Sequence, residues 1–381
     1  MKKQAGFTMV EFMVAMGVTL VIFAAAVGAV MSTMRSNQNV ALTSDLNDNL
    51  RASMNLVRQD IVMAGEGIPV GGISIPSGVG ITVKRPGPVA LRFQQPFLPA
   101  LSLGTALGPT VPILTRAGVA PGAGAPSDII TLIYQDNTWD SNPADNRRTA
   151  LDSAPIFQVA SGATPACNGS ITAAGDAVTF DANCVNMANA RVPVQPGDLF
   201  MFSNINGTAL QTVTSINGQV VSFASNPAVD KFGLNQSGAS QGTIKQIQNQ
   251  VTGSNPVAYT GTYPPTTATR IWMISYYLDT TTDPQHIRLV RQVNFSPTQP
   301  VAEVIEGLQA TYNFVDANTP PTIYANSTTI PAGLTESNIR SVNLFLSARA
   351  NNPSGSNSAY IRDNMKTQIS VRSLAYFSRY N

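Results

Sequence analysis

One acidic side chain in this sequence stands out as a group that could do chemistry, because it lies in an apolar segment. Glu11 follows two basic residues, Lys2 and Lys3, and precedes residues 12–34, which carry no charge. A carboxylate buried in a membrane costs on the order of a few kcal/mol, so it points to a functional site and needs a partner of opposite charge. The chemistry that Glu11 offers is therefore ion pairing.

Nucleophilic catalysis has little support in the sequence. The chain has one histidine, so any Ser-His-Asp or Cys-His arrangement must use His286. Its neighbours follow an Asp-Pro turn and favour a residue at the surface end of a strand. We expect no catalytic site, no cofactor and no enzymatic activity.

A metal site is also disfavoured. Asp136, Asp140 and Asp145 share one segment with several asparagines, but no glycine at the sixth position and no closing glutamate complete a calcium loop. We interpret them as turn residues. The two cysteines, Cys167 and Cys184, match no zinc pattern.

The cysteine pair instead predicts a disulfide that closes a polar surface loop. In an exported protein the two thiols would be oxidised, and a loop of this size would stabilise the fold by roughly 3 kcal/mol in the chain-entropy model. The alternative is a pair of buried free thiols. The spacing of Cys167 and Cys184 allows both.

Composition limits the partners. Charged residues make up 12% of the chain, with 23 Lys and Arg against 21 Asp and Glu, and no segment concentrates basic residues. Nucleic acid is therefore not an expected partner. After about residue 65 the chain is rich in Asn, Gln, Ser, Thr, Gly and Pro, which is typical of turn-rich extracytoplasmic β-structure.

The uncharged segment predicts a membrane-spanning helix. Residues 12–34 would span roughly 34 Å as a helix, which matches a hydrocarbon core of about 30 Å. Lys2 and Lys3 place the N-terminus in the cytoplasm and the rest of the chain outside. A secretory signal peptide is the alternative, but the apolar run is longer than usual, no small-residue cleavage site ends it, and Glu11 interrupts it.

The helical pattern continues beyond the membrane. One apolar stripe recurs at steps of three and four residues, formed by Leu42, Leu46, Leu50, Met54, Val57, Ile61 and Ala64. The charged residues of this segment, including Asp60, are expected on other faces. Gly65, Gly67 and Pro69 predict the end of the helix. The element would extend from about 7 to 64, near 87 Å, with Gly17 and Gly28 as its weakest points.

The remaining chain predicts an antiparallel β-sheet domain, so the fold class is α+β. Short apolar or alternating runs predict strands, and the longer polar segments predict extended loops at 95–127, 136–153, 226–265 and 316–333. The expected strands are 89–94, 129–135, 156–159, 198–203, 219–224, 272–278, 287–293, 308–315, 342–348 and 367–372. Whether this part is one domain or two stays open.

The string Gly6-Phe7-Thr8-Met9-Val10-Glu11 resembles the signal of type IV prepilins and pseudopilins. The resemblance implies that a prepilin peptidase cuts between Gly6 and Phe7 and that the new N-terminal Phe7 is methylated. It also implies that Glu11 pairs with the N-terminal amine of a neighbouring subunit. Met9 stands where the family more often has leucine, which keeps the apolar character. The resemblance divides the chain into a leader (1–6), a transmembrane helix (7–34), an amphipathic helix (35–64) and a β-rich head (65–381).

Several segments are similar to the PilW-type minor pilins and to the J-type minor pseudopilins of type II secretion. They are Arg51–Gly65, Ser127–Tyr134, Gly197–Phe202, Glu306–Asp316, Ile339–Arg349 and Gln368–Leu374. The similarity is loose in each segment but covers most of the chain. It implies a type IV pilin-like fold, in which the long helix packs on the sheet.

The resemblance implies a minor pilin that takes part in initiation, assembly or tip capping of a type IV pilus. A minor pseudopilin of a type II secretion system is the alternative, and a pilus-tip adhesin is a second one. Implied partners are prepilin peptidase, other major and minor pilins, the inner-membrane assembly platform and the lipid bilayer. The subunit would cross the bacterial inner membrane once, with a periplasmic head, and then move into the pilus. Without residues 1–6 the chain has 21 basic and 21 acidic residues, so bulk charge would contribute little to assembly.

Overall fold

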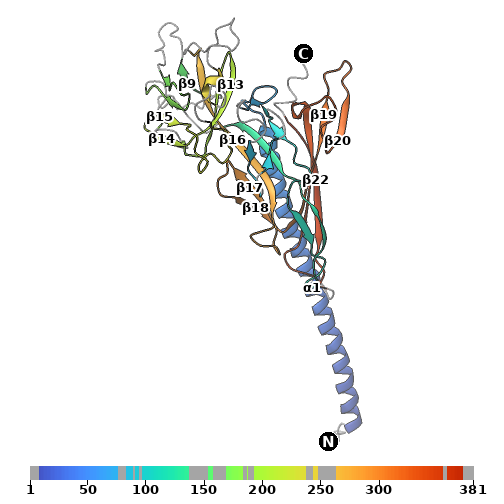
Figure 1. Ribbon diagram of the computed structural model, residues 1–381. Coiled ribbons are helices and arrows are strands. Elements are labelled where there is room, and N and C mark those ends of the chain that lie inside the picture. Colours follow the sequence, from blue (N-terminus) through green and yellow to red (C-terminus); the bar gives the residue numbers. More distant parts are fainter. Residues whose placement is uncertain are drawn as a thin grey trace, which may run out of the picture.

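A computed structural model shows a long helix that projects from a head built of antiparallel sheets (Figure 1). It describes residues 8–75, 83–88, 91–93, 97–136, 153–157 (backbone only), 169–182, 187, 193–236, 243–247, 263–354 and 358–371. The head consists of the strands and short helices that follow the long helix. The described fold is a long apolar helix with a mostly antiparallel β-sheet domain, as expected of the α+β class.

The helix, α1, extends without a break over Met9–Met63, so its 55 residues span about 83 Å. It is continuous through Gly17 and Gly28, and a Cβ added at either glycine would meet nothing within 4 Å. Its end is where the sequence predicts it. Gly65 (φ 80°) and Gly67 (φ 69°) take left-handed conformations, and an added Cβ at Gly67 would collide with the Gln135 side chain.

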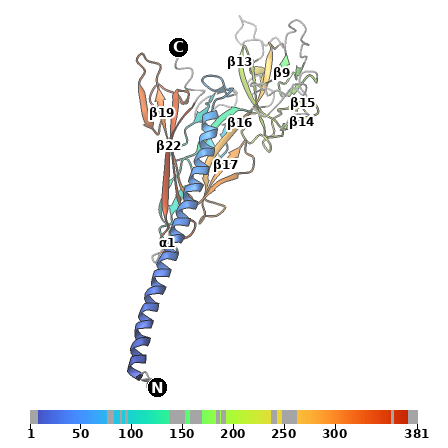
Figure 2. The ribbon, with the colours of Figure 1, turned by 180° about the vertical axis from the view of Figure 1, so that it is seen from behind.

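The helix has two halves with different surroundings. The projecting half, residues 8–41, has every side chain exposed and extends away from the head (Figures 1 and 2), with Asn39 near its end accepting a hydrogen bond from Ser354. The docked half, residues 42–63, lies along the head, and its apolar stripe is buried from Leu46 to Ile61. The predicted stripe is thus confirmed, with Leu42 half-buried at its start.

The largest sheet has eight strands and lies on one side of the docked half. Its central path is β13-β12-β16-β17-β18, β8 and β9 also pair with β16, and β5 pairs with β8. These strands are β5 (Leu101–Ser102), β8 (Ile130–Gln135), β9 (Ser153–Phe157), β12 (Leu199–Asn204), β13 (Gly207–Thr212), β16 (Thr266–Asp279), β17 (Arg288–Val293) and β18 (Gln299–Glu303).

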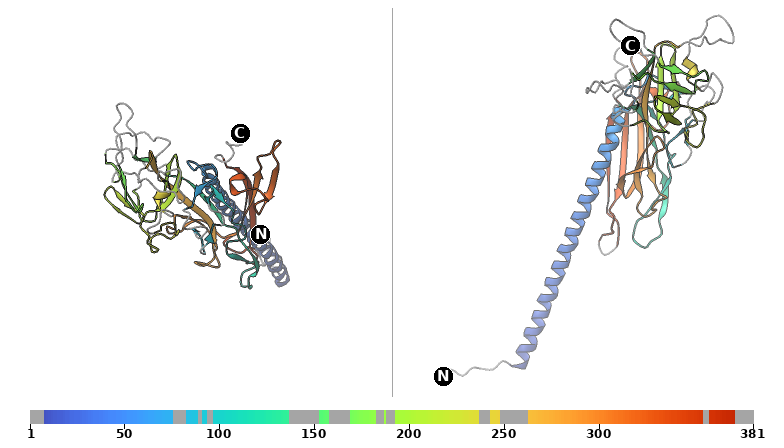
Figure 3. Two further views of the ribbon diagram at one scale, coloured as in Figure 1. Left: turned by 45° about the horizontal axis from the view of Figure 1, so that its top comes forward. Right: turned by 90° about the vertical axis from the view of Figure 1, so that its left-hand side faces the viewer.

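The C-terminal sheet lies on the other side of the docked half (Figure 3). Its order is β20-β19-β21-β22, formed by β19 (Ile305–Val315), β20 (Ile323–Ser327), β21 (Ile339–Arg349) and β22 (Arg362–Ser370). β19 and β21 pair from Ile305↔Ala348 to Phe314↔Ile339. Their alternate side chains, such as Leu308 and Leu344, face the helix and join its core.

The main core therefore forms between two sheets and one helix. Leu50, Val57 and Ile61 are fully buried against Ile274 of the large sheet and Leu346 of the C-terminal sheet. Burial of apolar surface is the dominant stabilising term in folding. The docked half is thus an integral part of the head.

A second core lies at the far end of the large sheet, away from the helix. There a small sheet of order β10-β11-β15-β14 packs on β12 and β13, around Phe200, Phe202 and Phe223. Its strands are β10 (Ser170–Ile171), β11 (Ala177–Thr179), β14 (Ser215–Asn217) and β15 (Val220–Ser222), and the short helix η2 (Ile244–Ile247) lies beside them. The 14-residue strand β16 belongs to both parts, pairing with β12 at one end and β17 at the other.

Short strands occupy two of the segments expected to be loops, so those predictions are wrong in part. Segment 95–127 contains β4 (Phe97–Leu98), β5, β6 (Thr110–Ile113) and β7 (Gly122–Pro126), and segment 316–333 contains β20. β6 and β7 form a hairpin, and β4 pairs with β1 (Ile73–Ser74). Hairpins of Pro, Gly and Ala carry little of the alternating apolar signal on which strand prediction depends. Most of segment 136–153 lies outside the described residues.

Each of the ten predicted strands overlaps a described strand, with different ends. The largest difference is β16, which starts six residues before the predicted Trp272. Nearly all of its side chains are buried, because both faces of this strand are covered, so it lacks the alternation of a half-exposed strand. The predicted strand 89–94 corresponds to the short strand β3 (Leu91–Arg92), which pairs with β2 (Lys84–Arg85). Residues Glu336–Asn338 form the short helix η3.

Candidate functional site

The projecting half presents a continuous apolar surface. Phe12, Leu20 and Phe23 have 62%, 68% and 69% of their surface exposed. Exposed apolar surface of this extent marks a membrane or protein contact. The helix is also long and apolar enough to cross a membrane, and its most apolar window is not buried by any part of the head.

Glu11 lies in the first turn of this helix and closes a capping box. Its Oε2 accepts hydrogen bonds from the backbone N–H and the hydroxyl of Thr8, both at 2.9 Å. The Thr8 Oγ1 in turn accepts from the Glu11 N–H at 3.4 Å. The local geometry fixes the carboxylate at the helix N-terminus, where the helix dipole favours a negative charge.

The capping box leaves the carboxylate with acceptor capacity. A carboxylate has about four lone-pair sites, and the Thr8 bonds use one oxygen. No ion pair joins Glu11 to a cation among the residues that the structure describes. Gly6 and Phe7, the predicted cleavage and methylation sites, lie outside the described residues, as do Cys167 and Cys184 of the predicted disulfide.

Another acid of the helix, Asp60, was expected on a face other than the apolar stripe, but it is buried together with the stripe, so that prediction is wrong. Asp60 is 5% exposed and lies at the contact between the docked half and the large sheet. Its Oδ2 accepts from the Tyr276 hydroxyl at 2.5 Å and from Arg291 Nε at 2.8 Å, and its Oδ1 accepts from the Tyr134 hydroxyl at 3.2 Å. Asp60 follows Val57 by three residues and precedes Ala64 by four, so its spacing already placed it beside the buried stripe.

The donors around Asp60 are held in their donating forms. Burial and the charge of Asp60 raise the pKa of both the Tyr134 and the Tyr276 hydroxyl, so both stay protonated. Burial acts to lower the pKa of Arg291, but the bond to Asp60 and its charge outweigh this and raise that pKa. A buried carboxylate with three such donors is compensated inside its own chain.

His286 and Asp136, considered above for catalysis and for metal binding, each contact a side chain of opposite charge type. His286 lies in the turn before β17, about 39% exposed, with its Nδ1 2.8 Å from Asp283 Oδ2. Asp136, interpreted above as a turn residue, is instead buried, with one oxygen 2.6 Å from Arg270 Nη2. Asp140 and Asp145 lie outside the described residues. Within the described ranges no group of three or more His, Cys, Asp or Glu side chains could hold a metal ion.

Arg270 is a buried cation that the sequence reading missed. It is fully buried on β16, donates to Asp136 and Asp198, and stacks 5.0 Å from the Trp272 ring centroid. Burial raises the pKa of Asp198, while hydrogen bonds and the Arg270 charge oppose that shift. A single charge inside a long apolar run was the available signal, since a buried charge needs a partner.

Comparison with known proteins bears on the projecting half. Residues 1–27 match the family model of the prokaryotic N-terminal methylation motif, a range that contains Gly6, Phe7 and Glu11. The motif indicates a type IV pilin-like or pseudopilin precursor. Searches of curated proteins and of solved structures each gave no significant match.

The matched motif has two implications. It implies processing by prepilin peptidase and assembly with other pilins. Together with the exposed apolar helix, it is consistent with a membrane-anchored, single-pass pilin. The match ends within the projecting half, so the head carries no family assignment from these comparisons.

Proposed function

We propose that this chain is a minor pilin that takes part in initiation, assembly or tip capping of a type IV pilus. Prepilin peptidase would cut between Gly6 and Phe7, and Phe7 would be methylated. The mature subunit would wait in the bacterial inner membrane, with its N-terminus in the cytoplasm and its head in the periplasm. The assembly platform would then move it into the filament.

One observation carries this proposal: Glu11 lies in an exposed apolar helix of membrane-spanning length and has no cation partner among the described residues. The N-terminal ammonium of Phe7 in a neighbouring subunit would supply the missing charge. Ion pairs in a low-dielectric surrounding are strong, and an unpaired charge there is costly. Glu11 would therefore favour the assembled state over the free subunit.

The head supports a minor rather than a major role. Its described part contains several hydrophobic core clusters and four-stranded and eight-stranded sheets, which is a large mass to repeat around a thin filament. A head-to-tail contact that does not close generates filaments, and a bulky subunit fits best at low copy number or at the tip. The head would select neighbouring pilins, while the projecting half would enter the apolar core of the filament.

A minor pseudopilin of a type II secretion system is the alternative, because the matched motif serves both machines equally. Deletion of the gene, followed by scoring of pili, twitching and protein secretion in the same strain, separates them. Loss of pili and twitching with normal secretion supports the pilin, and the reverse result supports the pseudopilin. A tip adhesin would instead lose attachment, with piliation intact, when a polar surface loop is deleted.

Processing is tested by a Gly6→Val variant. The unprocessed chain should keep residues 1–6, and mass spectrometry should find no mature chain that starts at Phe7. Gly28→Val is the matched control, because it makes the same substitution outside the predicted cleavage site, at a position of α1 with open space around it. A mature N-terminus at any residue other than Phe7 in the wild type would contradict the proposed site.

A further inference from the structure

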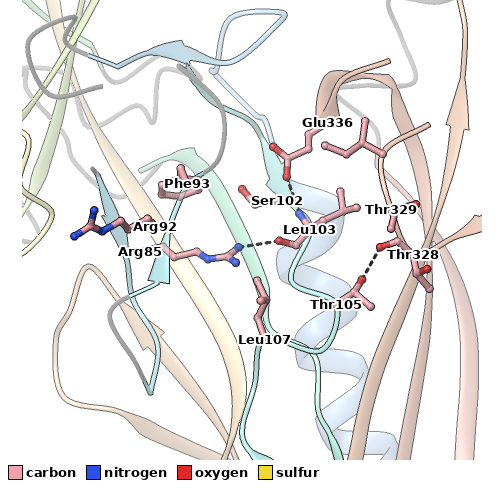
Figure 4. Close-up of a pocket in the computed structure, with 11 residues that line it drawn as sticks. Arg85, Arg92, Phe93, Ser102, Leu103, Thr105, Leu107, Thr328, Thr329 and Glu336 are labelled. Carbon is pink, nitrogen blue, oxygen red and sulfur yellow. Dashed lines mark hydrogen bonds between the residues drawn. The ribbon is translucent and has the colours of Figure 1, made fainter. Parts of the chain in front are cut away.

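A cleft in the head carries two buried side chains of opposite charge. It lies between the segment of β2, β3 and β5 and the connection from β20 to η3 (Figure 4). Its volume is about 450 Å³, which is large enough for a small organic ligand. We call it the Arg85–Glu336 cleft. No function proposed above uses it.

Arg85 is a buried cation with too few partners. It is 3% exposed, its Nη1 donates to the Leu103 carbonyl at 3.0 Å, and its Nε has no hydrogen-bond partner. Its guanidinium lies 5.8 Å from the Phe93 ring centroid. No carboxylate forms an ion pair with Arg85 in the described part of the chain, and burial lowers its pKa. A buried cation normally has a paired anion.

Glu336 is the matching buried anion. It is 7% exposed, and its Oε1 accepts a hydrogen bond from the Leu103 N–H at 2.8 Å. Burial raises its pKa, although the Leu103 bond and the charge of Arg85 oppose this shift. Arg85 and Glu336 thus bind the carbonyl and the N–H of the same residue, Leu103, without pairing with each other (Figure 4).

The remaining lining adds hydrogen-bonding groups and an apolar wall. Ser102, Thr105, Thr328 and Thr329 supply hydroxyls, and the Thr105 hydroxyl donates to the Thr328 carbonyl across the cleft at 2.9 Å. Arg92 lies exposed at the rim. Such a mixture of a few fixed polar groups with apolar contacts is typical of small-molecule sites.

We propose that the Arg85–Glu336 cleft binds a small zwitterionic ligand, a short peptide whose amino and carboxyl ends are both free. The ligand carboxylate would pair with Arg85, and its ammonium would pair with Glu336. A simple anion would meet the repulsion of Glu336, and a simple cation that of Arg85. A neutral sugar would leave both buried charges without a counter-charge, so the zwitterion satisfies the cleft best.

The binding test uses the full chain in detergent micelles and isothermal titration with tetraglycine. Tetraglycine should bind saturably, whereas N-acetyl-tetraglycine and tetraglycine amide, which each lack one charge, should bind about tenfold more weakly or worse. Methyl glucoside, a neutral probe, should not bind. Equal binding of all three peptides, no saturable heat from tetraglycine, or binding of methyl glucoside alone would each overturn the proposal.

Two variants connect the binding to the named side chains. Arg85→Met and Glu336→Gln should each weaken tetraglycine binding about tenfold or more, while Arg116→Met, at an exposed arginine outside the cleft, should not. Glu336→Gln keeps the acceptor for Leu103, and its melting temperature reports whether the fold is intact. If Arg85→Met fails to fold, the Glu336→Gln variant and the comparison of the three peptides still test the proposal. Wild-type affinity in a folded Glu336→Gln variant would overturn the proposal.

Discussion

The two halves of α1 share one backbone but have opposite surroundings. In the projecting half, apolar side chains cover all faces and all are exposed. In the docked half, the apolar side chains form one stripe, and the head's own sheets bury it. A helix that is apolar all round needs an apolar solvent or neighbouring subunits, whereas a one-sided stripe can be covered by its own chain. The projecting half therefore depends on other molecules and the docked half does not.

Two acids of the helix, Glu11 and Asp60, show the same contrast. Asp60 receives hydrogen bonds from Tyr134, Tyr276 and Arg291, so its charge is compensated within the subunit. Glu11 is bonded only by Thr8, its own capping partner, among the described residues. Removal of Asp60 should thus affect the folding of the subunit. Removal of Glu11 should affect its assembly.

The largest expected effect is on filament assembly. Glu11→Val should reduce incorporation into sheared filaments by about tenfold or more, because the proposed pairing with a neighbour's ammonium is lost. Processing and melting temperature of the head should not change. Immunoblots of filament and membrane fractions provide the measurement, with Asp45→Val, an exposed acid of the docked half, as control. Normal incorporation of the Glu11 variant would show that the two acids do not differ in this way.

The next effect is on folding. Asp60→Ala should lower the free energy of unfolding by about 4 kcal/mol, because it leaves Arg291 and two tyrosine hydroxyls without their shared acceptor. Urea unfolding of the full chain in detergent, followed by circular dichroism, measures it. Asp48→Ala, at an exposed position of the same helix, should change stability by less than about 0.5 kcal/mol. Similar values for both variants would contradict the network.

A pair of leucines tests the apolar part of the comparison. Leu50→Ala should cost about 3 kcal/mol of unfolding free energy, because Leu50 is fully buried in the main core. Leu20→Ala makes the same chemical change at a side chain that is 68% exposed, and should cost less than about 0.5 kcal/mol. The same unfolding assay measures both. A large loss from the Leu20 variant would mean that the projecting half also contributes to the head.

The smallest expected effect is the loss of unfolding free energy when the hydroxyl of Tyr276 or of Tyr134 is removed. Tyr276→Phe should cost about 2 kcal/mol and Tyr134→Phe about 1 kcal/mol, because hydrogen bonds to a charged acceptor are the stronger ones and the first of these two is shorter. The distances from the hydroxyls to Asp60 are 2.5 Å and 3.2 Å. In an Asp60→Ala background both costs should shrink, which a double-mutant cycle measures. Unchanged costs there would show that the hydroxyls act independently of Asp60.

Local patterns predicted much of the fold. The three- and four-residue recurrence from Leu46 to Ile61 identified the buried stripe, and Gly65 and Gly67 identified the end of the helix. Strands with one covered face, such as β19 and β21, were found near their true bounds. The hairpin of β6 and β7 and the full length of β16 were not. The former lacks apolar alternation, and the latter is buried on both faces.

Sequence alone thus determined the uncharged helix, the isolated Glu11 and the processing motif, because each depends on residues adjacent along the chain. Only the tertiary structure decided which groups surround Asp60, Arg85 and Arg270. Their surroundings come from segments distant in the sequence, as in the bond from Arg291 to Asp60, which are 231 positions apart. A charge is stabilised or destabilised by what lies within a few ångströms of it, and that neighbourhood exists only once distant segments have packed.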